Sequence, residues 1–153
     1  MKKIAIFPGS FDPITKGHES IIIRSLPLFD EIIIAIGVNS EKKGYFSAEQ
    51  RLAWINKVFE AFPQIKAITY QGLTVDLCKK VNASFILRGL RTSADFEFER
   101  SIGQMNKKLY SDIETVFLLT SPEYTHLSSS IVREIHKNGG NIQQFIPNGI
   151  MIP

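Results

Sequence analysis

The sequence has only one cysteine, Cys78, so no disulfide can form within the chain. It also has no apolar run approaching the ~20 residues that a membrane-spanning helix needs. The apolar stretch at residues 4–7 is too short for the core of a secretory signal peptide, and no small-residue cleavage site follows it. We therefore expect a cytoplasmic protein with no membrane partner.

The sequence also lacks a strong excess of one charge. Its formal net charge is +3 and its pI is about 9.0, with the basic residues scattered along the chain. A nucleic-acid-binding protein usually gathers its lysines and arginines on one stripe. We therefore expect no nucleic acid partner, whereas a small anionic ligand needs only a few convergent cations.

Several common catalytic motifs are absent. The sequence has no Walker-type phosphate loop, no Gly-x-Gly-x-x-Gly fingerprint and no Cys/His cluster spaced to bind zinc. It also has no Gly-x-Ser-x-Gly turn that would expose a serine nucleophile. The candidate site residues are therefore cations, hydroxyls and one histidine, with no evident covalent catalyst and no set of protein metal ligands.

Apolar, strand-like runs alternate with amphipathic segments along the whole chain. This pattern predicts an α/β fold with a single Rossmann-like domain over residues 1–153, in which a five-stranded parallel sheet has helices on both faces. The predicted strands are 4–7, 31–38, 65–70, 84–87 and 115–119. The first predicted helix begins near residue 17, and the others span 48–62, 74–81, 93–109 and 128–137, with a short helical turn at 141–145.

Local signals mark several element ends. Pro27 is expected to end or kink the first helix, because proline cannot donate a backbone hydrogen bond. Ser47 followed by Gln50 predicts a capping box at the start of the second helix. The isoleucine-rich segment 31–38 is typical of a strand that is buried on both faces.

The loop after the first strand, residues 7–18, has the strongest signal of a ligand site. In parallel sheets ligands bind beyond the carboxyl ends of the strands. Gly9 allows close approach of the backbone to a ligand, and Ser10 supplies a hydroxyl. Gly17 and His18 open a helix whose N-terminal amides attract phosphate, and His18 can donate to a phosphoryl oxygen. The alternative is a tight turn with a half-buried histidine.

Further polar residues follow the other predicted strands. Lys42 can reach a phosphate or lie in a solvated loop, and Thr74 is expected to cap a helix. The segment 88–91 after the fourth strand has two arginines around a glycine. Asp95 and Glu99, one helical turn apart, can pair with these arginines, hold a ribose or bind a metal ion.

The segment 120–133 follows the fifth predicted strand. Its three consecutive serines, 128–130, either cap a helix or present hydroxyls and amides to a triphosphate. Arg133 lies one turn further along, and His126 has no signal beyond its place in the loop.

These residues resemble the signatures of a known superfamily. The sequence Thr15-Lys16-Gly17-His18 resembles the (His/Thr)-x-Gly-His signature of the nucleotidylyltransferases. Residues 127–133 resemble its second signature, Ile-Ser-Ser-Ser/Thr-x-x-Arg, with leucine in the first position. Within that superfamily the chain is similar to the bacterial phosphopantetheine adenylyltransferases from about residue 3 to residue 146. The similar segments are 8–18, 42, 88–91, 95–97, 105–106 and 114–118, in the same order and spacing.

The resemblance implies a reaction in which ATP and 4′-phosphopantetheine give 3′-dephospho-coenzyme A and pyrophosphate, without a covalent enzyme intermediate. It also implies Mg²⁺ carried with ATP, a homohexamer, and feedback inhibition by coenzyme A. The alternatives are a sister nucleotidylyltransferase with another phosphate acceptor, or a non-catalytic nucleotide sensor on the same fold. A fragment related to the class I aminoacyl-tRNA synthetases is disfavoured because the chain has no room for a tRNA-reading domain.

The resemblance also implies roles for individual residues. The catalytic residues would be His18, Ser10, Lys42 and Arg91, with no protein ligand to a metal. The acceptor would bind to Ser10, Lys42, Thr74 and Arg88. ATP would bind to Gly9, Ser10, Phe11, His18, Gly89, Leu90, Arg91, Glu99, Tyr124, Thr125, His126, Leu127, Ser128, Ser129 and Ser130.

Overall fold

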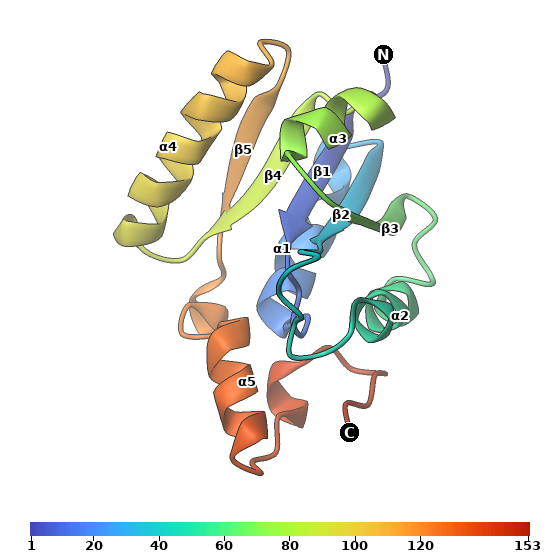
Figure 1. Cartoon of the computed structure of the whole chain (residues 1–153), viewed down its shortest axis with the longest axis vertical. Helices are drawn as coiled ribbons and strands as arrows, with labels where there is room; N and C mark the ends of the chain where they lie inside the picture. The colour runs from blue at the N-terminus through green and yellow to red at the C-terminus, as the bar shows by residue number, and fades with distance from the viewer.

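Five parallel strands form one sheet in the order β3-β2-β1-β4-β5, as the computed structural model of residues 1–153 shows (Figure 1). The predicted five-stranded parallel sheet is therefore confirmed. The strands are β1 (Ile4–Gly9), β2 (Glu31–Gly37), β3 (Ile65–Tyr70), β4 (Phe85–Leu90) and β5 (Glu114–Leu119).

Helices cover both faces of the sheet, as predicted. α1 and α2 pack on one face and α3 and α4 on the other, while α5 lies beyond the carboxyl ends of the strands (Figure 1). The helices are α1 (Lys16–Ser25), α2 (Ala48–Val58), α3 (Thr74–Val81), α4 (Ser93–Leu109) and α5 (Ser129–Lys137), with short 3-10 turns at Leu26–Leu28, Pro122–Tyr124 and Gln143–Phe145. None of these helices is both long and apolar enough to cross a membrane.

The strand β2 is buried on both faces, and this explains its unbroken apolar sequence. Alternate side chains of a strand point to opposite faces. Ile32, Ile34 and Ile36 therefore belong to the larger core, beneath α1 and α2. Ile33 and Ala35 belong to the smaller core, beneath α3. The prediction from the isoleucine-rich run is confirmed.

Two of the predicted helix boundaries, the end of α1 and the start of α2, are confirmed. The helix α1 ends at Ser25, and Pro27 lies in the 3-10 turn that follows. At the start of α2, the Gln50 backbone N–H donates to Ser47 Oγ at 3.1 Å, and the Ser47 backbone N–H donates to Gln50 Oε1 at 3.0 Å. This is the reciprocal pair of a capping box.

Three predicted ends are wrong. The first strand was expected to end at residue 7, but β1 continues to Gly9, which is paired with Ile36 of β2. The fourth strand was expected to end at residue 87, but β4 continues to Leu90 because its last residues stay paired with β5, with Arg88 opposite Phe117. The second helix was expected to reach residue 62, but α2 ends at Val58. Pro63 disfavours a helical conformation for the residue before it, and the chain leaves the helix a turn earlier.

The strand order creates a switch point beside β1. The chain passes from β1 to β2 and β3 on one side of the sheet, then crosses back to β4 and β5 on the other side. The loops after β1 and β4 therefore diverge at the carboxyl end of the sheet. Open α/β sheets bind ligands at such a crevice.

Candidate active site

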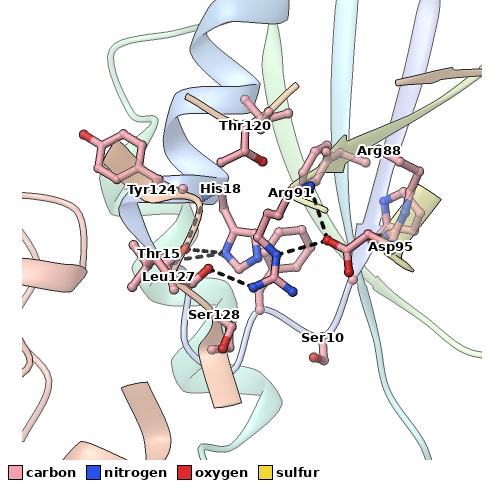
Figure 2. A pocket seen from close by; sticks show the side chains of 18 of the residues that line it. Ser10, Thr15, His18, Arg88, Arg91, Asp95, Thr120, Tyr124, Leu127 and Ser128 are labelled. Carbon is pink, nitrogen blue, oxygen red and sulfur yellow. Dashed lines mark hydrogen bonds and ion pairs between the residues drawn. The ribbon is translucent and has the colours of Figure 1, made fainter. Parts of the chain in front are cut away.

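A cleft of about 290 Å³ lies at the switch point between the carboxyl ends of β1 and β4. Four chain segments contribute to it: β1 with its loop, the first turns of α1, β4 with its loop, and the connection from β5 to α5 (Figure 2). Its lining residues are Phe7, Pro8, Gly9, Ser10, Phe11, Thr15, Gly17, His18, Ile21, Arg88, Gly89, Arg91, Asp95, Glu99, Thr120, Tyr124, Leu127, Ser128 and Ser129.

His18 is held by a capping box at the start of α1. The Thr15 backbone N–H donates to His18 Nδ1 at 3.0 Å, and the His18 backbone N–H donates to Thr15 Oγ1 at 3.3 Å (Figure 2). A backbone N–H can only donate, so Nδ1 must be the acceptor and carries no proton. The neutral ring therefore has its proton on Nε2, and Nε2 has no hydrogen-bond partner in the protein.

The surroundings of His18 favour this neutral form. Burial, together with the nearby charges of Arg88 and Arg91, lowers the pKa of His18 from its ordinary 6.5 to about 4. The Phe11 ring packs against the imidazole edge-on, with the ring centres 4.9 Å apart. Phe11 has a φ of 47°, an unusual value for a residue with a side chain, and its ring also lies over Gly9.

Arg91 is oriented by two contacts beside His18. Its Nη1 donates to the Leu127 carbonyl at 3.3 Å, and its Nε lies 3.4 Å from Asp95 Oδ2 (Figure 2). The same Asp95 oxygen accepts the Arg91 backbone N–H. The guanidinium Nη2 has no protein partner, so Arg91 can still donate to an anion in the cleft.

Arg88, in contrast, has a protein partner on each of its three guanidinium nitrogens. Its Nε and Nη2 donate to the two carboxylate oxygens of the buried Glu99, at 2.9 and 2.7 Å, and its Nη1 donates to the Pro8 carbonyl. Of the alternatives for Asp95 and Glu99, the structure shows pairing with the arginines. The role of Glu99 in ATP binding stays a prediction.

A second cavity of about 220 Å³ adjoins the first on the other side of the Arg88–Glu99 pair. It shares Pro8, Gly9, Arg88 and Glu99 with the cleft and extends beneath α3 and α4, where it is also lined by Tyr70, Thr74, Ile86, Ile102, Gly103, Asn106 and Thr115. Thr74 is the first residue of α3 and not its cap: its hydroxyl is 2.9 Å from the Tyr70 hydroxyl, and Leu73 occupies the cap position. The predicted capping role of Thr74 is therefore wrong.

The serines at the start of α5 tie it to the first loop. Ser128 Oγ caps the helix by accepting the Ile131 N–H at 3.3 Å, and Ser129 Oγ donates to the Pro13 carbonyl at 2.8 Å. Arg133 donates to the Asp12 carbonyl at 2.8 Å and to Ser130 Oγ at 3.2 Å. The second signature segment is therefore bonded to the loop just before the first signature, and Ser128 and Ser129 also line the cleft.

Most of the predicted site residues lie together in this cleft, but five line neither cavity. Lys42 lies in the exposed loop after β2, and Leu90 is buried in β4. Thr125 and His126 are exposed in the loop before α5, and Ser130 contacts Arg133. Their predicted roles stay predictions.

The cavities also contain residues that were not among the predicted binding residues. Thr15, Ile21 and Thr120 line the cleft. Thr15 lies three residues before His18, which is the spacing of a capping box with histidine in place of Glu or Gln. Ile21 lies three residues after His18 on the same helix face, and Thr120 directly follows β5. Tyr70 and Asn106 line the second cavity without a comparable local signal.

Comparison with known proteins gives consistent matches. A family model described as cytidylyltransferase-like matches residues 6–135. The chain is 57% identical over 148 residues to the phosphopantetheine adenylyltransferases of Flavobacterium psychrophilum and Flavobacterium johnsoniae, a match that covers 97% of this chain and 97% of each relative. It is 51% identical to the phosphopantetheine adenylyltransferase of Cytophaga hutchinsonii, covering 96% of this chain and 98% of that one.

Solved structures share the fold at lower identity. A putative nicotinate-nucleotide adenylyltransferase from Vibrio parahaemolyticus aligns with a TM-score of 0.71 at 20% identity, over 95% of this chain and 94% of that one. A bifunctional NMN adenylyltransferase/ADP ribose pyrophosphatase from Francisella tularensis aligns with a TM-score of 0.73 at 18% identity, over 95% of this chain and 45% of that one. By the near full-length match to its relatives, the chain belongs to the phosphopantetheine adenylyltransferase family.

Proposed function

We propose that this protein transfers the adenylyl group of ATP to 4′-phosphopantetheine, giving 3′-dephospho-coenzyme A and pyrophosphate. The observation that carries the proposal is the pair of adjoining cavities at the switch point, which share Gly9 and Arg88. The first contains His18, Arg91 and the start of a helix, which suit a nucleotide phosphate. The second is lined by apolar and polar side chains with Arg88 at the boundary, which suits an arm that ends in a phosphate.

In the proposed reaction, an oxygen of the acceptor phosphate attacks the α-phosphorus of ATP in line with the leaving group. One oxygen–phosphorus bond forms, the bond from the α-phosphorus to the bridging oxygen breaks, and pyrophosphate leaves with the electron pair. The attacking phosphate is already anionic, so no strong general base is required. Catalysis then rests on positioning and on the stabilisation of charge at the α-phosphate.

His18 is suited to the second task as a neutral donor. Its Nδ1 is occupied by the Thr15 N–H, so its Nε2–H is left to donate to an α-phosphate oxygen. Arg91 and the positive end of α1 add favourable charge on the same side of the cleft. Ser10, at the end of β1, would contact both substrates.

Mg²⁺ would enter with ATP, bound to its phosphates. Both carboxylates that line the cleft are already paired, Asp95 with Arg91 and Glu99 with Arg88. That donor set fits an ion that keeps phosphate and water ligands, as Mg²⁺ commonly does. The ion would neutralise phosphate charge, and the side chains around the cleft would orient the nucleotide.

The acceptor would lie across the boundary between the two cavities. Its arm would follow the second cavity past Thr74, and its phosphate would meet the cleft beside Arg88. Lys42 would approach that phosphate from the exposed loop after β2. Coenzyme A has both a pantetheine arm and an adenine nucleotide, so it would compete for both cavities and restrain the enzyme as an end product.

Self-association into a homohexamer is supported by the apolar surface of α4. Five large apolar side chains of this helix are exposed in the single chain, and Glu99 is its only buried residue. An exposed apolar surface of this extent is typical of a protein interface.

We also infer a cytoplasmic location, because ATP and the intermediates of coenzyme A synthesis are found there.

A pyrophosphate-release assay tests the proposal directly. Purified protein given ATP, Mg²⁺ and 4′-phosphopantetheine should release pyrophosphate in proportion to acceptor consumed. If it releases none but turns over glycerol 3-phosphate with CTP, or nicotinamide mononucleotide with ATP, the protein is a sister transferase with another acceptor.

The variant His18→Ala separates the enzyme from a nucleotide sensor. We expect kcat to fall by about 10²-fold or more while ATP affinity, measured by calorimetry, stays nearly unchanged, because the lost donor acts mainly in the transition state. An unchanged kcat would remove His18 from the mechanism. ATP binding with no turnover of any acceptor by the unaltered protein would favour the sensor.

A further inference from the structure

The loop between β2 and α2, residues 38–47, has few hydrogen bonds of its own that could hold Lys42 in one position. Residues 39–45 are all exposed. The bonds within the loop are the Lys42 N–H to the Asn39 carbonyl at 3.3 Å and the Glu41 N–H to Asn39 Oδ1 at 2.9 Å. The place of Lys42 relative to the cleft therefore depends on how the end of the loop is anchored.

The inner anchor of this loop is a buried carboxylate on the first loop. Asp12 accepts the Tyr45 N–H at 2.7 Å and the Phe46 N–H at 2.9 Å. The buried Arg51 donates to the Phe46 carbonyl at 3.1 Å and to the Ser10 carbonyl at 2.8 Å. The 38–47 loop is therefore bonded to Asp12 and linked to the backbone of Ser10 through the Arg51 side chain.

The outer anchor is a hydrogen bond between Tyr45 and His136 of α5. The Tyr45 hydroxyl is 2.7 Å from His136 Nδ1, and the two rings meet edge-on with centres 5.5 Å apart. The His136 ring also packs against Phe46, and its Nε2 contacts the Pro153 carbonyl. Tyr45 therefore joins the first loop through its backbone and α5 through its side chain.

We propose that Tyr45 and His136 are positioning residues for the acceptor, because their hydrogen bond fixes the 38–47 loop and with it Lys42. The inference rests on the proposed function, in which Lys42 meets the acceptor phosphate. Without this bond the loop keeps its inner anchor at Asp12 but loses its side-chain hydrogen bond to α5. Lys42 then samples more positions, and the anionic acceptor binds more weakly, while the residues around ATP stay in place.

The experiment compares Tyr45→Phe and His136→Ala with the unaltered protein, with Lys137→Ala as the control on the same helix. Tyr45 is exposed and His136 is half-buried, and neither belongs to a hydrophobic core, so the variants should fold and unfold near the midpoint of the parent. We expect each variant to raise the KM for 4′-phosphopantetheine about three- to tenfold, the effect of one hydrogen bond. The KM for ATP and kcat should stay within about twofold. The double variant should raise this KM no more than His136→Ala alone, because the Tyr45 hydroxyl has no partner once the histidine is removed.

A Lys42→Ala background shows whether the bond acts through Lys42. If it does, adding Tyr45→Phe to Lys42→Ala should raise the acceptor KM no further. The inference would be overturned if Tyr45→Phe raised the acceptor KM as much in the Lys42→Ala background as it does in the unaltered protein. It would also be overturned if the KM for ATP rose as much as the acceptor KM, or if the variants had the same KM values as the unaltered enzyme. Absence of turnover by the unaltered protein would instead overturn the proposed function.

Discussion

At the scale of single residues, His18 differs from an ordinary histidine in both protonation and tautomer. The Thr15 N–H fixes Nδ1 as an acceptor, and burial beside two arginines disfavours the imidazolium. These two effects act together, because burial and the arginines favour the neutral ring and the Thr15 N–H leaves its proton on Nε2. A neutral donor can approach ATP without changing its own charge before the reaction.

The first prediction concerns the titration of His18 in the free protein. Its ring should stay neutral as the pH is lowered through 6.5 and take up a proton only near pH 4, because burial, Arg88 and Arg91 all lower its pKa. Nitrogen-15 NMR of the imidazole should show protonated Nε2 and unprotonated Nδ1 across pH 5.5–7.5. A midpoint near the ordinary 6.5 would contradict the prediction.

The same shift predicts how stability changes with pH. Above pH 6.5 the ring is neutral in both the folded and the unfolded chain, and between pH 6.5 and about 4 only the unfolded chain takes up the proton. The contribution of His18 to the free energy of unfolding therefore falls as the pH falls through this window. Urea unfolding at pH 7 and pH 5 should show a larger loss for the parent than for His18→Gln, which cannot titrate.

The sequence indicates the kind of residue at this site better than the contacts each one makes. His18 and Ser10 could be predicted because a glycine-rich loop between a strand and a helix fixes their place in any parallel sheet. The pairing of Arg88 with Glu99 was only one of three alternatives, because the spacing of charges does not show whether two side chains meet. The Tyr45–His136 bond joins residues 91 positions apart and has no local signal.

At the scale of elements, the local signals at Ser47 and Pro27 predicted two helix boundaries better than the apolar runs predicted strand ends. The capping box at Ser47 and the position of Pro27 involve neighbours in the sequence, so a short pattern is sufficient. The end of β4 depends on β5, which pairs with it from more than 25 residues away. A tertiary hydrogen bond therefore kept Arg88 and Gly89 in the strand, where the sequence alone suggested a loop.

The prediction at the scale of elements concerns α4. Phe98 and Met105 are 67% and 58% exposed on a helix that otherwise packs on β4 and β5. If this surface mediates self-association, a charge placed on it will be costly to bury. Phe98→Glu should therefore lower the mass measured by light scattering, while the unfolding midpoint of the separated chains changes little.

Arg100→Glu is the matched control for that change. Arg100 lies on the same helix, about half a turn away from Phe98, and its contact is an exposed ion pair with Glu97. It receives the same carboxylate and changes the net charge by more than Phe98→Glu does, because a positive charge is also removed, and we expect the measured mass to be unchanged. Equal dissociation by both variants would show that net charge, and not the apolar surface of α4, controls assembly.

At the scale of the whole molecule, the C-terminal segment shows where periodicity misleads. Ile142, Ile146 and Ile150 recur every four residues, a spacing typical of a helix, and all three are buried in the larger core. The segment is nevertheless mostly irregular, because Pro147 and Gly149, with its φ of 90°, interrupt any helix. The expected helical turn at 141–145 is present, but the sequence did not indicate that the segment beyond it closes the core.

The sheet separates two cores of unequal size, and this asymmetry leads to the last prediction. Neighbouring residues of β2 face opposite cores: Ile34 is fully buried in the larger one, and Ile33, 5% exposed, lies in the smaller one. Truncation of a buried isoleucine to alanine costs about 2–5 kcal/mol, and the cost depends on how far the surroundings can relax into the cavity. The larger core is enclosed by several elements and can relax little, whereas the smaller one lies beneath the short helix α3. Ile34→Ala should therefore lower the free energy of unfolding in urea more than Ile33→Ala does, and the reverse order would show that the smaller core is the more rigid.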